Sequence, residues 1–155
     1  MDCREAAPLA MPKFAAYIQS RGGPAVRGLI VSACLCVALA GPALAGTNPE
    51  AAAAYKRGDY AQAFRLWHAQ AEQGDPDAQS MVAFLFHDGE GVPKDLVRAH
   101  MWFELSRSNS PANDQSWHDA SDALDLTAKD MTAKQIAKAK NMARACQSQN
   151  YRNCD

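Results

Sequence analysis

The sequence predicts an all-α fold in which antiparallel helix hairpins stack side by side as a solenoid. Signals for strands are missing after residue 47, because β-branched residues are scarce there and no alternating apolar run reaches five residues. Apolar residues recur instead every three or four positions, between glycines and prolines that mark helix ends. Trp67 and Trp102 lie 35 residues apart, each on the second helix of a predicted pair, and periods in the thirties are typical of helical repeats.

The first predicted hairpin begins at Asn48, and Pro49 suits the first turn of its helix because the missing N–H group costs nothing there. Gly58 ends this helix as a left-handed cap, and Asp59 caps a second helix that ends at Gly74. The apolar stripe of this second helix has helical spacing. It consists of Tyr60, Ala63, Phe64, Trp67 and Ala71.

The second predicted hairpin begins at Asp75, which caps a helix with Pro76 in its first turn. The buried stripe of that helix is expected to be Ala78, Met81, Val82, Leu85 and Phe86. Residues 88–91 form a turn with two glycines that are free to adopt positive φ. Asp95 caps the next helix, which we expect to be central because it is apolar over a broad face. That face consists of Leu96, Ala99, Met101, Trp102, Phe103 and Leu105.

The rest of the chain predicts two further helices and a tail. Residues 107–113 are polar and predict a loop, within which Ser110-Pro111 starts the fifth helix. Its inward residues are expected to be Trp117, Ala120, Ala123 and Leu124. Thr132 and Gln135 have the spacing of a capping box for the last helix. That helix is expected to bury Ile136, Ala139, Met142, Ala143 and Cys146. Residues 147–155 predict a polar tail that only Cys154 holds to the body.

Residues 1–45 have the pattern of a secretory signal peptide. Positive charge precedes an apolar run at residues 29–40, and an Ala-Leu-Ala motif ending at Ala45 is the small-x-small pattern that signal peptidase accepts. We therefore expect cleavage after Ala45 and a periplasmic or secreted protein. The true start is open between Met1 and Met11.

Two membrane-linked alternatives are weaker. The apolar run would span only about 18 Å as a helix, against a hydrocarbon core of about 30 Å, so no permanent span is expected in the mature chain. Residues 31–34 resemble a lipobox with Cys34 as the lipidated residue. The apolar run ahead of Cys34 is too short for a signal peptide, so lipid anchoring is disfavoured.

Charge and cysteine content narrow the classes of partner. The chain has a formal net charge of −1, which suggests neither nucleic acid nor an anionic membrane surface. After residue 45 it carries twelve Lys and Arg against fifteen Asp and Glu, a net charge of −3.

Cys146 and Cys154 are the two cysteines that remain after cleavage of the signal peptide, and an even number of cysteines in an oxidising compartment predicts a disulfide. Metal or redox chemistry fits less well, since the spacing is not C-x-x-C and no histidine is near.

Two strings of residues resemble the Sel-one-like repeats, relatives of the tetratricopeptide repeat. A-E-Q-G-D-x-D-A-Q occupies residues 71–79, and G-x-G-V-P-x-D occupies residues 89–95. The resemblance is strong from Ala54 to Ser106 and weaker as far as about Ala145. The positions that carry the repeat core are Ala63, Trp67, Ala71, Gly74, Ala78, Val82, Phe86, Gly89, Gly91, Pro93, Ala99, Trp102 and Phe103.

The resemblance implies a right-handed α-solenoid of about two repeats and a C-terminal capping helix. Residues 46–106 would form the repeat core, residues 107–146 a degenerate second repeat with capping helices, and residues 147–155 the tail tied by the disulfide. The chain departs from the family at Ala83, where a glycine is usual, and at Phe86, where a tyrosine is usual. One extra methyl group should preserve the packing there.

For this family the resemblance implies binding of proteins or peptides, often as adaptors or cell-envelope assembly factors. The first helix of each pair lines the concave surface, so the candidate partner contacts are Ser80, Phe84, His87 and Trp117. Packing on a neighbouring helix is the alternative for Phe84, and Trp117 is expected to be half exposed. The leading hypothesis is a non-catalytic scaffold in the bacterial cell envelope.

No motif for catalysis, cofactor or metal is apparent, so none of these is expected. The mature chain's four histidines lack zinc-site spacing, its serines lack a G-x-S-x-G context, and the Gly89–Gly91 turn lacks the Lys-Ser/Thr of a phosphate loop. Two alternatives stay open. One is weak β-lactam binding or hydrolysis, the single reaction that the family suggests. The other is a self-associating structural component, since two repeats leave their stacking faces exposed.

Overall fold

The computed structural model describes residues 48–152 and 154, and this part of the chain contains six α-helices and no strand. The predicted all-α fold is confirmed. The predicted signal peptide, including Cys34, lies outside the described residues.

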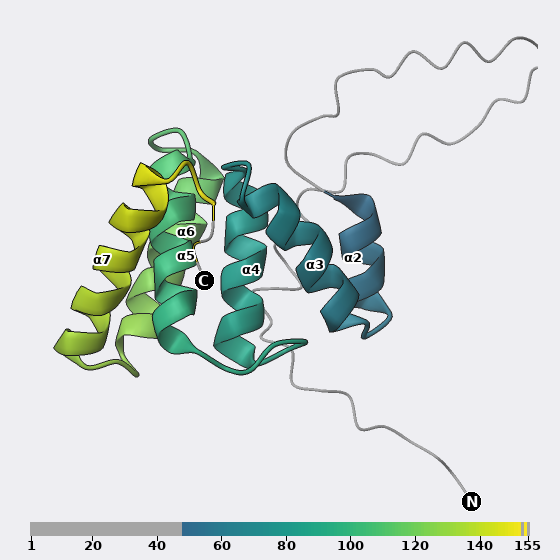
Figure 1. Ribbon diagram of the computed structural model, residues 1–155, viewed down its shortest axis with the longest axis horizontal. Coiled ribbons are helices and arrows are strands. Elements are labelled where there is room, and N and C mark those ends of the chain that lie inside the picture. The colour runs from purple at the N-terminus through teal and green to yellow at the C-terminus, as the bar shows by residue number, and fades with distance from the viewer. Residues whose placement is uncertain (1–47, 153, 155) are drawn as a thin grey trace, which may run out of the picture. The chain divides into compact units, whose positions relative to one another are not determined.

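The helices are α2 (Pro49–Lys56), α3 (Tyr60–Ala71), α4 (Pro76–Asp88), α5 (Leu96–Asn109), α6 (Gln115–Ala128) and α7 (Ala133–Ser148). From α2 to α5 they lie side by side in sequence order and alternate in direction, and α6 and α7 both pack on α5 (Figure 1). This helical-hairpin packing is that of an α-solenoid.

Short polar side chains begin five of the six described helices where the sequence predicts, α6 being the exception. Asn48 accepts hydrogen bonds from two backbone N–H groups at the start of α2. Thr132 and Gln135 form the predicted capping box of α7, with each side chain bonded to the other's backbone. The remaining predicted caps are Asp59, Asp75 and Asp95. Each cap pairs N–H groups that the helix itself leaves without an acceptor.

Helix α5 is longer than predicted, because residues 107–109 are helical and not part of a loop. It ends at Ser110, whose position before Pro111 favours extended backbone. Ser110 has φ −76° and ψ 142°, and both its N–H and its hydroxyl donate to the carbonyl of Ser106. These two bonds satisfy the last turn of α5 and turn the chain away.

Helix α6 starts later than predicted. Asp114 caps it, and its first helical residue is Gln115, so Ser110-Pro111 belongs to the connection before it. At the other end of the chain, α7 continues to Ser148 and takes in the first residues of the predicted tail.

Helix α5 lies at the centre, as its broad apolar face predicts. It packs against α4, α6 and α7 (Figure 1). The five consecutive residues Ala99 to Phe103 are all buried. Since one turn of helix contains 3.6 residues, this stretch is covered on every side. The Trp102 ring also meets the ring of His68 on α3, with centroids 5.6 Å apart, so α5 reaches the first hairpin as well.

Aromatic rings fill the space between α2, α3 and α4. Trp67 contacts Tyr55 with a centroid separation of 5.8 Å. Phe64 meets Phe86 edge to face at 5.4 Å, an arrangement that the ring quadrupoles favour. The first contact holds α2 against α3 within the first hairpin, and the second joins the first hairpin to the second.

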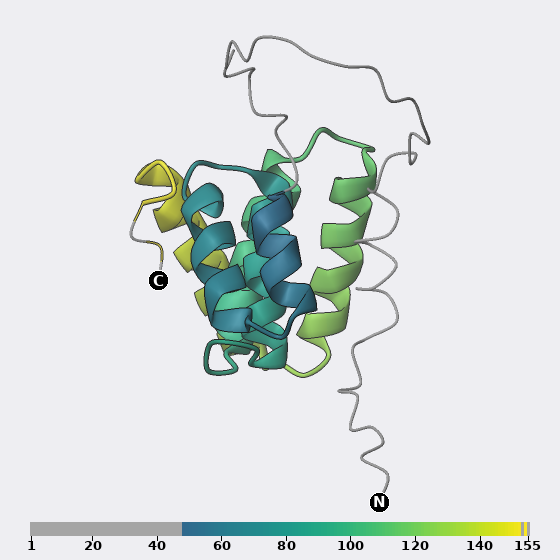
Figure 2. The same ribbon diagram turned by 90° about the vertical axis from the view of Figure 1, so that its right-hand side faces the viewer.

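Helices α6 and α7 lie on opposite sides of α5, which Figure 2 shows in a view from the α2 end. Each packs on α5, and they are not extensively packed on each other. The last pair therefore differs from the closed hairpin that the sequence predicts. Helices α6 and α7 each bury one narrow stripe of mostly small residues, and this stripe packs mainly against α5. These stripes are Ser116, Ala120, Ala123, Leu124 and Thr127 on α6, and Ala139, Ala143 and Cys146 on α7.

The turn after α4 fits closely against the start of α3. Gly91 has φ +73°, and a Cβ atom there would lie 2.5 Å from the carbonyl carbon of Tyr60. Both the backbone conformation and the available space therefore require glycine. This glycine of the G-x-G motif is thus a contact between the two hairpins.

The replacement Gly91→Ala should lower the free energy of unfolding by about 3 kcal/mol or more, because a collision with Tyr60 is added to the cost of positive φ. Gly58→Ala is the matched control. Gly58 also has positive φ (+80°), but an added Cβ would meet nothing within 4 Å, so we expect a loss of about 1 kcal/mol. Urea unfolding followed by circular dichroism measures both variants. Equal losses would contradict the close fit at Gly91.

Candidate partner-binding surface

Ser80 is not available on the surface, and its predicted contact role was wrong. It is 3% exposed, and its hydroxyl oxygen lies 2.7 Å from that of Ser106 on α5. Ser106 in turn donates to the carbonyl of Pro76 at 2.8 Å. The two hydroxyl groups therefore pair with each other where α4 and α5 touch, as buried polar groups must.

His87 is also buried, which corrects the prediction for this residue. Its Nδ1 atom lies 2.6 Å from the Oδ1 atom of Asp88, at the end of α4. Phe84 is half buried, and its ring meets that of Phe103 edge to face at 4.9 Å. For Phe84 the structure therefore supports packing on a neighbouring helix, with part of the ring still accessible.

Trp117 is half buried at the start of α6, as the sequence predicts. Its ring contacts that of the exposed His118, with centroids 5.1 Å apart. Phe84 and Trp117 are thus the two predicted contact residues that are only half buried. They lie on α4 and α6, which contact each other. We call these two side chains the aromatic pair.

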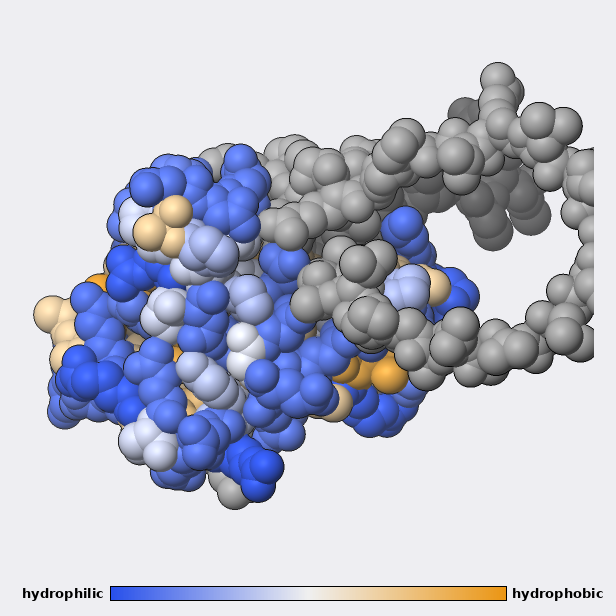
Figure 3. All heavy atoms as spheres, turned by 90° about the horizontal axis from the view of Figure 1, so that it is seen from above, coloured by the Kyte–Doolittle hydropathy of each residue, from blue (hydrophilic) through white to orange (hydrophobic). Residues whose placement is uncertain are grey.

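The face of the molecule seen in Figure 3 is mostly hydrophilic, with a few separate apolar areas. On α6 the exposed residues include Asp122 and Asp125, and this helix contains no Lys or Arg. The helix that carries Trp117 is therefore acidic.

The predicted repeat-core residues divide into two structural groups. The buried group is Ala63, Trp67, Ala71, Ala78, Val82, Phe86, Ala99, Trp102 and Phe103. The others, which lie in the connections between helices, are Gly74, Gly89, Gly91 and Pro93.

Glu90 forms a polar contact between the hairpins that the sequence did not reveal. It faces Tyr55 and Tyr60 at the turn between α2 and α3. Burial, followed by a hydrogen bond to Glu90, raises the pKa of Tyr55 above its ordinary value. Burial, followed by the negative charge of Glu90, raises the pKa of Tyr60. Together with Gly91, this contact fixes one end of the joint between the hairpins, which we call the Glu90 joint.

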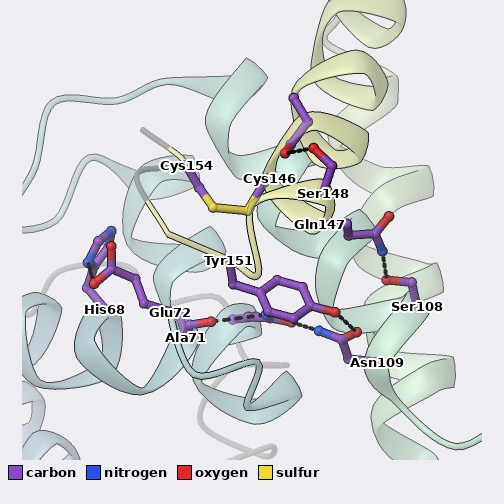
Figure 4. The surroundings of a disulfide bond; sticks show 12 residues. His68, Ala71, Glu72, Ser108, Asn109, Cys146, Gln147, Ser148, Tyr151 and Cys154 are labelled. Carbon is purple, nitrogen blue, oxygen red and sulfur yellow. Dashed lines mark hydrogen bonds and ion pairs between the residues drawn. A yellow bond between two sulfur atoms is a disulfide. The ribbon is translucent and has the colours of Figure 1, made fainter.

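The tail after α7 is held by more than a cysteine, which corrects the prediction (Figure 4). The Tyr151 hydroxyl donates to Asn109 Oδ1 at 2.7 Å. Asn109 Nδ2 donates to Gln79 Oε1 at 3.0 Å, and Gln79 Nε2 donates to the carbonyl of Ala71 at 3.1 Å. A chain of hydrogen bonds therefore runs from the tail through α5 and α4 to the end of α3.

Cys146 and Cys154 lie together as the sequence predicts. Their Cα atoms are 4.9 Å apart, and the structure pairs their sulfur atoms (Figure 4). Both residues are buried beside the end of α7.

His100 on α5 is 3% exposed, and neither of its ring nitrogens has a hydrogen-bond partner. The nearest opposite charge is Glu104, whose Oε1 atom lies 3.8 Å from Nε2. Glu104 also pairs with Arg107 at 2.6 Å and with Lys140 of α7 at 3.8 Å. Burial lowers the pKa of His100 below its ordinary value, and the charge of Glu104 only partly opposes this. The ring is therefore neutral at pH 7.

Among the residues that the structure describes, no group of three or more His, Cys, Asp or Glu side chains is arranged to hold a metal ion. No described helix combines the length and the apolar character needed to cross a bilayer.

Comparison with known families identifies the hairpins. The family model for the Sel1 repeat matches residues 49–75 and 76–110. The chain carries two Sel1 repeats. The first consists of α2 and α3, and the second consists of α4 and α5 and ends at Ser110, where α5 stops. No curated protein and no solved structure matches the chain at a significant level. Sel1 repeats are generally protein-interaction modules.

The stability of this Sel1 repeat protein should depend on the protonation of His100. The pKa of His100 is lowered in the folded protein, so the unfolded chain takes up the proton first. The free energy of unfolding should therefore fall as the pH drops below about 6.5, and this contribution should level off once the pH is below the lowered pKa. In His100→Leu this part of the pH dependence should be absent. Urea unfolding at several pH values between 8 and 4 measures it.

The exposed residue His118 provides the matched replacement, since His118→Gln also removes one histidine but leaves the buried ring of His100 in place. If the free energy of unfolding of the wild type and of His100→Leu changed with pH in the same way, the buried ring of His100 would not contribute to the pH dependence.

Proposed function

We propose that this protein is an exported, non-catalytic scaffold that binds a protein or peptide partner in the bacterial cell envelope. The observation that carries the proposal is the pair of stacked Sel1 repeats, since such repeats are protein-interaction modules. Stacked hairpins present a continuous surface made of several helices, which suits an extended or helical segment of a partner.

The aromatic pair is the proposed point of contact. Phe84 and Trp117 keep part of their rings accessible on two adjoining helices, and aromatic side chains contribute strongly to binding at the centre of interfaces. The negative charge of α6 favours a partner that presents apolar and basic groups together.

The location in the envelope rests on the leader and the cysteine pair. Residues 1–45 have the pattern of a cleavable signal, with cleavage after Ala45. The closeness of Cys146 and Cys154 is what a disulfide of an exported protein requires. Both features support export into an oxidising compartment.

The test is co-purification from envelope extracts of cells that express the full chain with its own leader. The expected result is a protein whose first residue is Gly46 and a partner recovered reproducibly in near-stoichiometric amount. Trp117→Ala should weaken binding of that partner at least tenfold, because a buried aromatic contact is worth about 1.4 kcal/mol or more. The melting temperature of the Trp117→Ala variant should stay within a few degrees of that of the wild type.

Lys138→Ala is the matched control. Lys138 is exposed on α7, which lies on the other side of α5 from α6, so this change should leave binding intact. A protein retained in the cytosol with residues 1–45 still attached would refute export. Equal binding by the Trp117→Ala variant would refute the proposed surface.

A further inference from the structure

The chain after α7 is bent back sharply at two consecutive residues. Asn150 and Tyr151 have φ values of 52° and 62°, a left-handed conformation that asparagine often adopts after a helix but that a bulky residue such as tyrosine rarely adopts. The N–H group of Tyr151 donates to the carbonyl of Cys146 at 3.0 Å. Cys146 thus accepts this bond through its backbone while its sulfur is paired with Cys154 on the far side of the bend. The cysteine pair encloses the bend and holds it in an unfavourable conformation.

This bend places the Tyr151 side chain on the joint between the two Sel1 repeats (Figure 4). Gly74, in the turn between α3 and α4, has φ +85°, and a Cβ atom there would lie 3.2 Å from a ring carbon of Tyr151. The tyrosine ring therefore lies directly against the backbone of the turn that links the first repeat to the second.

The hydroxyl group of Tyr151 extends the contact to the second repeat. It donates to Asn109 at the end of α5, and Asn109 donates to both Gln79 and the carbonyl of Gly74, the latter at 3.4 Å. Gln79 is fully buried and donates to the end of α3. Hydrogen bonds thus link the tail to the second repeat and to the end of the first.

The joint between the repeats has two ends. Tyr151 covers the end formed by the C-terminus of α3 and the N-terminus of α4. The Glu90 joint lies at the opposite ends of the same two helices, between the start of α3 and the turn after α4. The cysteine pair is connected through the tail to the end of the joint that Tyr151 covers. The Glu90 joint contains no cysteine.

We propose that the Cys146–Cys154 disulfide closes a clasp that fixes the first Sel1 repeat against the second, and that the reduced protein has a joint that opens at the Tyr151 end. The Glu90 joint then acts as the pivot. In the reduced chain the left-handed backbone at Tyr151 is offset by the hydrogen bonds and the ring contact of Tyr151 without the disulfide, so the tail leaves Gly74 and Asn109 more often.

Closure is an oxidation of two thiols. Cys146 and Cys154 together give up two electrons and two protons, and an S–S bond forms between them. A disulfide-bonded oxidant accepts them by thiol–disulfide exchange and becomes a dithiol. The proposed export would bring the protein into a compartment that holds such an oxidant. The clasp itself does not depend on export, because purified protein can be oxidised in solution. The expected consequence is that the precursor has a loose repeat joint before export and a rigid one afterwards.

Amide hydrogen exchange on the purified full chain tests the clasp. Cys3, Cys34 and Cys36 are first replaced by serine, so that Cys146 and Cys154 are the remaining thiols. On reduction, the amides at residues 73–75 and in the last turn of α5 should exchange at least tenfold faster. The amides of Gly89 and Glu90, which bond to the carbonyl of Leu85 at the other end, should not change.

Two variants separate the clasp from a general loss of stability. Cys146→Ser with Cys154→Ser should reproduce the reduced protein without any reductant. Tyr151→Phe keeps the disulfide but loses the bond to Asn109, so it should give a smaller increase at the same amides.

Faster exchange confined to residues 147–155 would overturn the proposal, because the tail would then leave the joint unaffected. An equal increase at Gly89 and Glu90 would also overturn it, because reduction would then destabilise the whole fold. Since the experiment uses purified protein, failure of the clasp is distinguishable from a failure of export.

Discussion

Burial of α5 on every side is the constraint on which the other contacts depend. Its central residues are covered by α4, α6 and α7, and Trp102 extends to His68 on α3. A Sel1 hairpin does not bury its own apolar stripe, so each needs a neighbour. The second repeat packs against the first repeat through α4 and against α6 and α7 through α5. These last helices are held by α5 more than by each other, so they act as two separate covers and not as a third hairpin.

The two ends of the repeat joint rest on different chemistry. At one end the fit is steric and polar, because Gly91 touches the backbone of Tyr60 and Glu90 faces two phenol groups. At the other end it depends on the tail, through Tyr151 and Asn109. Both ends set the angle between the repeats, and this angle fixes where α4 and the helices after it stand.

The helices could be predicted from the sequence because their signals are local. Capping residues such as Asn48 and Thr132 lie within three residues of the groups that they bond, and apolar spacing repeats within one helix. The end of α5 was placed too early, since Arg107 to Asn109 are polar and their helical state depends on tertiary packing. Exposure of site residues was predicted less well. Ser80 is buried because it meets Ser106, 26 residues away. Tyr151 bonds to Asn109 across 42 residues, and such polar pairs leave no periodic pattern.

Amide hydrogen exchange in a Trp102→Ala variant tests most directly whether the stacked repeats form one cooperative structure. Trp102 is fully buried in the second repeat, and its loss is expected to cost about 3–5 kcal/mol. If the hairpins depend on one another through α5, the amides of α3 and α7 lose protection together and to a similar degree. If α3 keeps its wild-type protection while α7 loses it, the hairpins fold independently and the account is wrong.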